Sequence, residues 1–284
     1  MKNHIFSPGK LLITSEYFVL DGALALAVPT RLGQDFYSEE EKDGASMVFW
    51  EALHENKPWL SIQIDYKNWE IVQTNLPESA AFILKVLQNV QKLSTEKFHS
   101  DSTYKITTNL QFPANYGLGS SSTLMNNLAE WFHIDAFLLN ELSLGGSGYD
   151  IAVAQEKSAI LYQNNPRKIE RVEFNPSFTD DLIFIHLNQK QDSREGIRAF
   201  QSQKKSLDLR TDFSEITQKI GIYTGWDYAR IIEHLVDFWK IETLTGLDGA
   251  AAKAQEFLAN LADRYMRLAD RIKAPDEVSL AWLK

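Results

Sequence analysis

The stretch Pro113-Ala-Asn-Tyr-Gly-Leu-Gly-Ser-Ser-Ser122 gathers glycines and hydroxyl side chains at one point of the chain. It follows an alternating apolar run from Tyr104 to Phe112 and precedes a helical stripe from Leu124 to Phe132. Glycines let the backbone approach an anion, and the N–H groups and dipole of a first helical turn favour negative charge. The stretch therefore predicts a phosphate-binding loop between a strand and a helix. The alternative is a plain turn with a serine N-cap.

The flanking sequence extends the alternation of strand and helix signals. Residues Leu60 to Tyr66 alternate like a half-buried strand, and residues Ile83 to Val90 have helical spacing after Asn75 and Pro77, which predict an N-cap and a first-turn proline. We further expect a short helix after Asp150 and strands at 159–162 and 182–187. From about residue 213 onward the periodicity is helical almost throughout.

Composition narrows the class of protein. A chain of 284 residues with 44% hydrophobic content can bury a core as one large or two joined domains. The net charge of -9 disfavours nucleic acid and anionic membranes as partners. There is no cysteine, and the six histidines show no helical metal-ligand spacing. Because the N-terminal residues break at Pro8-Gly9 and no apolar run reaches the length of a membrane span, we expect a cytoplasmic protein.

Two further segments give the loop a context. Ser7-Pro8-Gly9-Lys10 leads into Ser15-Glu16-Tyr17-Phe18-Val19-Leu20-Asp21-Gly22, and Gly146-Ser147-Gly148-Tyr149-Asp150-Ile151-Ala152 follows the loop. With residues 113–122, these strings resemble, in the right order, the first motif, the catalytic-aspartate segment and the second motif of the GHMP kinases, the family of galactokinase, homoserine kinase, mevalonate kinase and phosphomevalonate kinase. The first string looks most like the mevalonate and phosphomevalonate branch, with serine in place of glycine at 15. The last resembles the subgroup named for its Gly-Tyr-Asp-Ile-Ala string.

The resemblance implies an ATP-dependent kinase that uses Mg²⁺ and moves the γ-phosphate to a hydroxyl or phosphate of a small anionic acceptor such as mevalonate or phosphomevalonate. It implies Asp150 and Lys10 as catalytic residues, although alone these would be a helix cap and a surface lysine. The remaining residues that it implies are Gly117, Leu118, Gly119, Ser120, Ser121 and Ser122 for the ATP phosphates, Glu16, Tyr17, Ser147, Ser193 and Arg194 for the substrate, and Ser121 and Glu141 for the metal.

The family's third, glycine-rich motif is not found, and the nearest string, at 243–251, keeps only two of its glycines. We therefore expect an α+β fold with a GHMP-kinase-like two-layer N-terminal ATP-binding domain at 1–165. The C-terminal domain at 166–284 is expected to be helix-rich, divergent or partly replaced by helices. A sugar kinase of the same family and a catalytically degenerate nucleotide-binding or scaffold protein remain alternatives. The helical C-terminal portion could also form the interface of a homodimer.

Overall fold

The computed structural model describes residues 3–15, 17–95, 97–99 and 101–175, together with positions 211, 214, 215, 217 and 218. The chain separates into two units, Met1–Val172 and Glu173–Lys284. Nearly all described residues belong to the first unit. The strand expected at 182–187 and the helical stripes expected from residue 231 onward lie outside the described residues.

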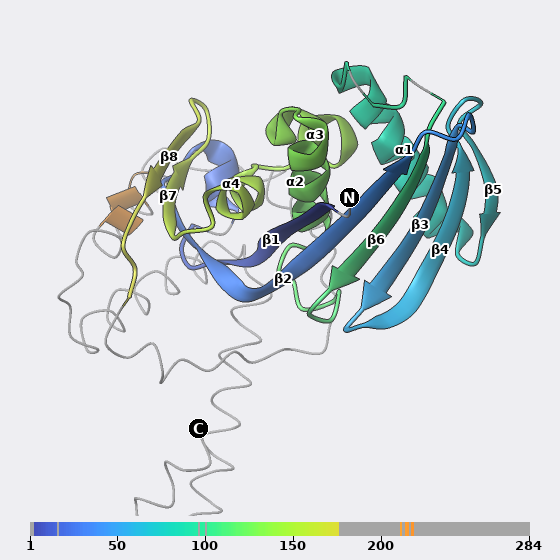
Figure 1. Ribbon diagram of the computed structural model, residues 1–284. Helices are drawn as coiled ribbons and strands as arrows, with labels where there is room; N and C mark the ends of the chain where they lie inside the picture. Colours follow the sequence, from blue (N-terminus) through green and yellow to red (C-terminus); the bar gives the residue numbers. More distant parts are fainter. Residues whose placement is uncertain are drawn as a thin grey trace, which may run out of the picture. The chain divides into compact units, whose positions relative to one another are not determined.

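The first unit is built on an eight-stranded sheet in the order β5-β4-β3-β6-β2-β7-β8, with β1 paired to β2 (Figure 1). The long strand β2 pairs with β6 through residues 34–41 and with β7 through residues 25–27, so it joins the two parts of the sheet. Strands β3 and β6 run parallel, and the other pairs within this sheet are antiparallel. The strands are β1 (Asn3–Leu12), β2 (Ala25–Glu41), β3 (Met47–His54), β4 (Lys57–Asp65), β5 (Glu70–Thr74), β6 (Thr103–Leu110), β7 (Ile160–Gln163) and β8 (Lys168–Arg171).

Helices α1 (Pro77–Leu93), α2 (Ser120–Phe132) and α3 (Ala136–Ser143) lie together over one face of the sheet, and α4 (Tyr149–Glu156) lies beside β7 (Figure 1). A single turn of 3-10 helix, η1 (Phe18–Asp21), links β1 to β2. The main core lies between the sheet and α1, α2 and α3, where Phe36, Tyr104 and Leu128 are fully buried. Burying such large apolar side chains is the chief force that holds the two layers together.

The described elements confirm the expectation of an α+β fold with a mixed sheet and helices. Strands at 60–66 and 104–112, helices at 83–90 and 124–132, and the short helix and strand after Asp150 are all present within a few residues. The expected cap at Asn75 is wrong, because Leu76 is the N-cap residue of α1. The Asn75 side chain instead accepts from the Ser61 N–H and donates to the Trp59 carbonyl, which fixes it to β4.

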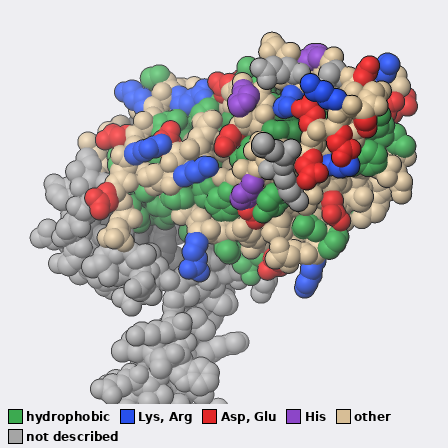
Figure 2. Space-filling view, viewed as in Figure 1, with side chains coloured by type: hydrophobic (Ala, Val, Ile, Leu, Met, Phe, Trp, Pro, Cys, Tyr) green, Lys and Arg blue, Asp and Glu red, His purple; other side chains and the backbone are tan. Residues whose placement is uncertain are grey.

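Acidic and basic side chains are interspersed on the face of the molecule drawn in Figure 2. Two ion pairs hold the segment after α1 and strand β6 to β2: Lys97 pairs with Glu40, and Lys105 pairs with Glu41. Within the residues that the structure describes, no helix is long and apolar enough to cross a membrane.

A candidate anion-binding site at the start of helix α2

The loop between β6 and α2 has the backbone geometry that the glycines predict. Gly117 and Gly119 have φ values of 74° and 83°, a region that disfavours side chains, and Gly119 is the N-cap residue of α2. No side chain caps α2. The first N–H groups of a helix have no partner within the helix, and they carry the positive end of its dipole. The start of α2 is therefore a place where a bound anion would be stabilised.

Strand β1 brings Lys10 to this loop. The register with β2 shifts between Pro8 and Lys10, and the Lys10 N–H donates to the Leu118 carbonyl at 3.0 Å. Gly9 permits this approach, because a Cβ atom there would lie 2.9 Å from the Leu118 oxygen and 2.6 Å from Thr30 Oγ1. The first and second sequence motifs are thus in direct contact.

Helix α4 (Tyr149–Glu156) brings the string at residues 146–152 to the same place. Lys10 Nζ donates a hydrogen bond to the Tyr149 hydroxyl at 2.7 Å and lies 5.0 Å from the centre of its ring. Asp150 Oδ2 accepts from the Ser122 hydroxyl at 2.5 Å, and its Oδ1 accepts from the Ile151 N–H at 3.1 Å. Both carboxylate oxygens of Asp150 thus accept hydrogen bonds, which fix the orientation of the carboxylate beside the start of α2.

The loop before α4 is held by Tyr162 on strand β7. The Tyr162 hydroxyl donates to the Ser147 carbonyl at 2.5 Å. Burial raises the pKa of Tyr162 to about 12, the nearby Asp150 charge adds to the rise, and Arg167 opposes it. The phenol therefore keeps its proton at any physiological pH and remains a donor. Gly148, the N-cap residue of α4, has a φ of 82° at this point.

A buried amide network fixes α2 against β1 and β2. Ser7 donates to the Asn127 side-chain oxygen at 2.7 Å and accepts from Asn126 at 2.8 Å, and Asn127 donates to the Gln34 carbonyl at 3.0 Å. Thr123, in the second turn of α2, donates to the Gln34 side chain at 3.0 Å. Because all these side chains are buried, their hydrogen bonds set the position of α2 along the strands.

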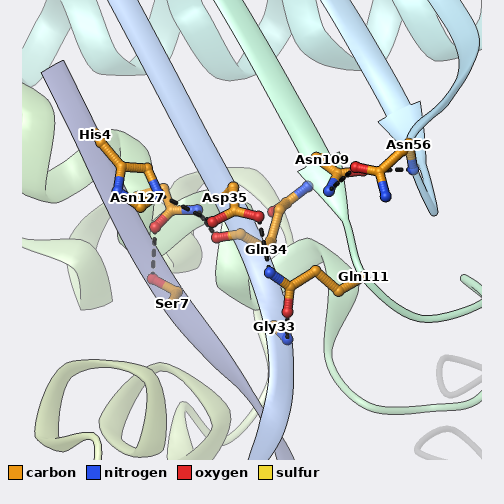
Figure 3. A network of polar contacts seen from close by, with 9 residues as sticks. All are labelled: His4, Ser7, Gly33, Gln34, Asp35, Asn56, Asn109, Gln111 and Asn127. Carbon is orange, nitrogen blue, oxygen red and sulfur yellow. Dashed lines mark hydrogen bonds and ion pairs between the residues drawn. The ribbon is translucent and has the colours of Figure 1, made fainter. Parts of the chain in front are cut away.

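Figure 3 shows part of this network beside a second, more exposed chain of contacts on β1, β2 and the segment after β6. Asp35 accepts from Gln111 and pairs with His4, and Gln111 accepts from the Gly33 N–H. Asn109 at the end of β6 is joined to Asn56. These contacts tie down the strand that leads into the phosphate loop.

The structure brings together, around the start of α2, five of the residues singled out in the sequence, Lys10, Leu118, Gly119, Ser122 and Asp150. Ser121, expected as a magnesium ligand, is exposed, and the neighbouring Ser122 contacts the Asp150 carboxylate instead. Glu141 is exposed on α3, and Tyr17 begins η1 with a φ of 61°. Glu16, Ser193 and Arg194 lie outside the described residues. Ser147 lies in the loop before α4, where its carbonyl accepts from Tyr162.

Sequence reasoning missed the contact between Tyr149 and Lys10 and the role of Asn126 and Asn127. The helical spacing of α2 was read from its apolar residues, whereas these two asparagines lie among them and are buried. Two adjacent amide side chains inside an otherwise apolar helical stripe could have indicated a buried hydrogen-bond network. Gly148, not Asp150, is the N-cap residue of α4, so Asp150 is not the helix cap that it would be if taken alone.

Comparison with known proteins gives two different answers. Among solved structures, the chain is similar to the mevalonate kinase of Methanococcus jannaschii (TM-score 0.61, 12% identity, 88% of this chain and 81% of that one). It is also similar to the Streptococcus pneumoniae phosphomevalonate kinase (0.58, 15%, 87% and 80%) and the Lactococcus lactis galactokinase (0.50, 14%, 95% and 72%). At such identities the likeness concerns the fold alone, and it supports a GHMP-like fold.

In sequence, the family model for fatty acid desaturase matches residues 198–283. The stearoyl-[acyl-carrier-protein] 9-desaturase of Brassica napus is 36% identical over 124 residues, which are 44% of this chain and 30% of the relative. That of Simmondsia chinensis is 46% identical over 70 residues (25% and 18%), and the palmitoyl-[acyl-carrier-protein] 4-desaturase of Coriandrum sativum is 36% identical over 76 residues (25% and 20%). The chain thus spans less than a third of the length of these relatives.

These matches overturn part of the functional expectation. They point to a desaturase and to fatty acid metabolism, and the expectations of an ATP-dependent kinase and of the mevalonate pathway are therefore wrong. The expected cofactors, ATP and Mg²⁺, are wrong on the same ground, because desaturases of this kind use a diiron centre with O2 and a reductant. The physical reason for the error is that the loop motif indicates a backbone geometry suited to an anion. That geometry alone does not determine which anion is bound or which reaction follows.

The donor set of this chain does not fit a diiron centre. Helical di-iron sites take a Glu from each of two helices and a Glu-x-x-His pair from each of two others. The matched residues 198–283 contain a single histidine, His234, and the third residue before it is Ile231.

Elsewhere in the sequence, Glu-x-x-His spacings begin at Glu51, Glu96 and Glu130. The first lies on strand β3, and the third ends α2 with His133 in the left-handed conformation. Among the residues that the structure describes, no group of three or more His, Cys, Asp or Glu side chains could hold a metal ion.

Proposed function

We propose that the N-terminal unit binds the phosphate group of a small-molecule substrate at the start of helix α2, and that the chain is an enzyme of fatty-acyl metabolism. The observation that carries the first part is the convergence of Lys10, the uncapped start of α2 and the Asp150 carboxylate. A cation and a helix N-terminus attract a phosphate, and a carboxylate beside them can accept a proton from a substrate hydroxyl. Descent of this unit from the mevalonate and phosphomevalonate kinase branch is part of the proposal.

The roles follow from the contacts. The N–H groups of Ser120 and Ser121 would donate to the phosphate oxygens, and Lys10 would neutralise their charge. Asp150, oriented by Ser122, would hold the reacting hydroxyl. Ser147 and Tyr17 remain candidates for the rest of the substrate. Glu16, Ser193 and Arg194 stay predictions, as do the cytoplasmic location and the homodimer.

The second part rests on the desaturase match over residues 198–283. We propose that this segment contributes to binding an acyl-carrier-protein substrate, since the curated relatives that share it are named for such substrates. The match does not extend to a complete set of iron ligands within the chain. Desaturation would therefore require iron ligands beyond these 284 residues.

A titration of the full chain with inorganic pyrophosphate, followed by calorimetry, tests the first part. The wild type should bind, and Lys10→Gln should weaken binding by about tenfold or more, as expected for the loss of a charged hydrogen bond. Lys57→Gln is the matched control, because it removes the same charge from an exposed position on β4. If wild-type protein does not bind pyrophosphate, or if both variants bind equally well, the proposed site is wrong.

The second part is tested by titrating a saturated acyl-[acyl-carrier-protein] into the full chain. Binding that is lost when residues 198–284 are removed is the expected result. Equal binding by a chain that ends at residue 197 would contradict a role for the segment, once the circular dichroism of the shortened chain has shown that it remains folded.

A further inference from the structure

We infer that Tyr149 is a positioning residue, which holds the charged end of Lys10 where it can meet a phosphate at the start of α2. The inference rests on the proposed function of the N-terminal unit. Its starting point is the hydrogen bond of 2.7 Å from Lys10 Nζ to the Tyr149 hydroxyl. Lysine carries a point charge on a flexible four-carbon stem, so its contribution to a site depends on what restricts that stem.

The stem of Lys10 is restricted at its other end by the loop. The Lys10 backbone donates to Leu118, and a Cβ atom at Gly119 would lie 3.2 Å from Lys10 Cγ and 3.4 Å from Lys10 Cε. The side chain therefore runs along the N-cap residue of α2. With its base fixed on the loop and its tip fixed on Tyr149, the ammonium group is limited to a small region beside the helix start.

Tyr149 can act in this way because the first turn of α4 is itself held in place. The Tyr162 hydroxyl binds the Ser147 carbonyl, and a Cβ atom at Gly148 would lie 3.1 Å from Phe137 Cδ1 and 3.3 Å from the Tyr162 oxygen. The next residue, Asp150, is fixed by Ser122 on α2. Two consecutive residues of α4 thus set the two charged groups of the site: Tyr149 holds the Lys10 ammonium group, and Asp150 supplies the carboxylate.

A phosphate needs the lysine to be near but not neutralised. The phenol of Tyr149 is an uncharged acceptor, so it can orient Lys10 without cancelling its charge. The ring, 5.0 Å from Nζ, adds a cation–π attraction that persists when the hydroxyl is removed. Tyr149→Phe therefore isolates the effect of the hydrogen bond.

A double-mutant cycle with pyrophosphate as the probe tests the inference. Tyr149→Phe should weaken binding by about twofold to tenfold, the range expected for the loss of one ordinary hydrogen bond. In the Lys10→Gln background the same substitution should have no further effect, because Tyr149 acts only through Lys10. Tyr37→Phe, which removes a hydroxyl from strand β2, is the matched control and should bind like the wild type.

The outcomes separate the two proposals. If the wild type binds no pyrophosphate, the proposed function fails and this inference fails with it. If Lys10→Gln loses affinity while Tyr149→Phe binds like the wild type, the site stands and the positioning role is overturned. An equal loss from Tyr149→Phe in both backgrounds indicates a merely structural effect and also overturns it. Tyr149→Leu, which removes ring and hydroxyl together, should weaken binding further in the wild-type background alone, and thermal melts establish that each variant is folded.

Discussion

The N-terminal unit, residues 1–172, holds the candidate anion-binding loop with Lys10 and Asp150, whereas residues 198–283 hold the sequence likeness to fatty acid desaturases. In the first region three strings far apart in the sequence meet at one place in space. In the second, a long sequence match contains one histidine and no Glu-x-x-His pair. The comparison teaches that a sequence match can omit the residues that carry out the chemistry. It also teaches that residues far apart in the sequence can meet on a fold shared with structures only 12% and 15% identical to this chain.

The largest expected effect tests whether the buried amides hold the first region together. Asn127→Leu would leave Ser7 and the Gln34 carbonyl without their partner in a buried place, at a cost of about 2–4 kcal/mol in the free energy of unfolding. Chemical denaturation of the full chain measures it.

Gln73→Leu, at an exposed position of β5, is the control and should change stability by less than about 0.5 kcal/mol. A loss from Asn127→Leu no larger than that of the control would contradict the account of how α2 is positioned.

The second prediction concerns the metal content of the whole chain. Protein produced with an excess of ferrous iron and then desalted should contain well under about one iron atom per chain, because the donor set of a di-iron site is incomplete. Elemental analysis measures the iron content, with the stearoyl-[acyl-carrier-protein] 9-desaturase of Brassica napus treated in parallel as the positive control. Two tightly held iron atoms per chain would refute the reading of residues 198–283 as a segment without its own metal centre.

The third prediction concerns the contact that orients Asp150. Ser122→Ala removes the donor to Asp150 Oδ2. Pyrophosphate affinity should change by less than about threefold, because a carboxylate accepts hydrogen bonds and offers none to the anion. The free energy of unfolding should fall by about 1–2 kcal/mol. Ser121→Ala, one residue earlier and exposed, serves as the control for stability. Equal stability of the two variants would show that the Ser122–Asp150 contact does not form.

The fourth and smallest prediction concerns pH. The pKa of Tyr162 is raised to about 12 in the folded unit, above the ordinary tyrosine value of 10.0. The neutral phenol is therefore favoured by folding, so its contribution to stability is complete below pH 10 and is lost as the pH rises from 10 towards 12. Thermal melts over this range should show a fall that Tyr162→Phe reduces. An identical alkaline fall in the variant would contradict the assignment.

Much of the fold could be predicted because its elements have clean periods. Strand β4 and strand β6 alternate, and α1 and α2 have apolar residues at helical spacing. The cap of α1 was mispredicted because Asn75 satisfies strand β4 instead of the helix, a choice that depends on a tertiary contact. The order of the strands across the sheet was not predictable from local patterns.

For the candidate site, the sequence could predict which segments take part, but not which side chains contact one another. The likeness to a family brought Lys10, the loop and Asp150 together, and it named Ser121 as a metal ligand, which stays a prediction; it did not reveal that Ser122 donates to Asp150. A rotation of one residue on a helix moves a side chain by about 100°, so the string alone could not decide between neighbouring serines. The desaturase likeness was missed because its helical stripes are those of any core-facing helix.

The most direct measurement is a crystal structure of the full chain grown with pyrophosphate. The account predicts one phosphate group at the start of α2, within hydrogen-bonding distance of the N–H groups of Ser120 and Ser121 and of Lys10 Nζ. Lys10 should remain in contact with Tyr149. A crystal in which pyrophosphate binds elsewhere, or in which the start of α2 is occupied by a side chain of the protein itself, would contradict the account.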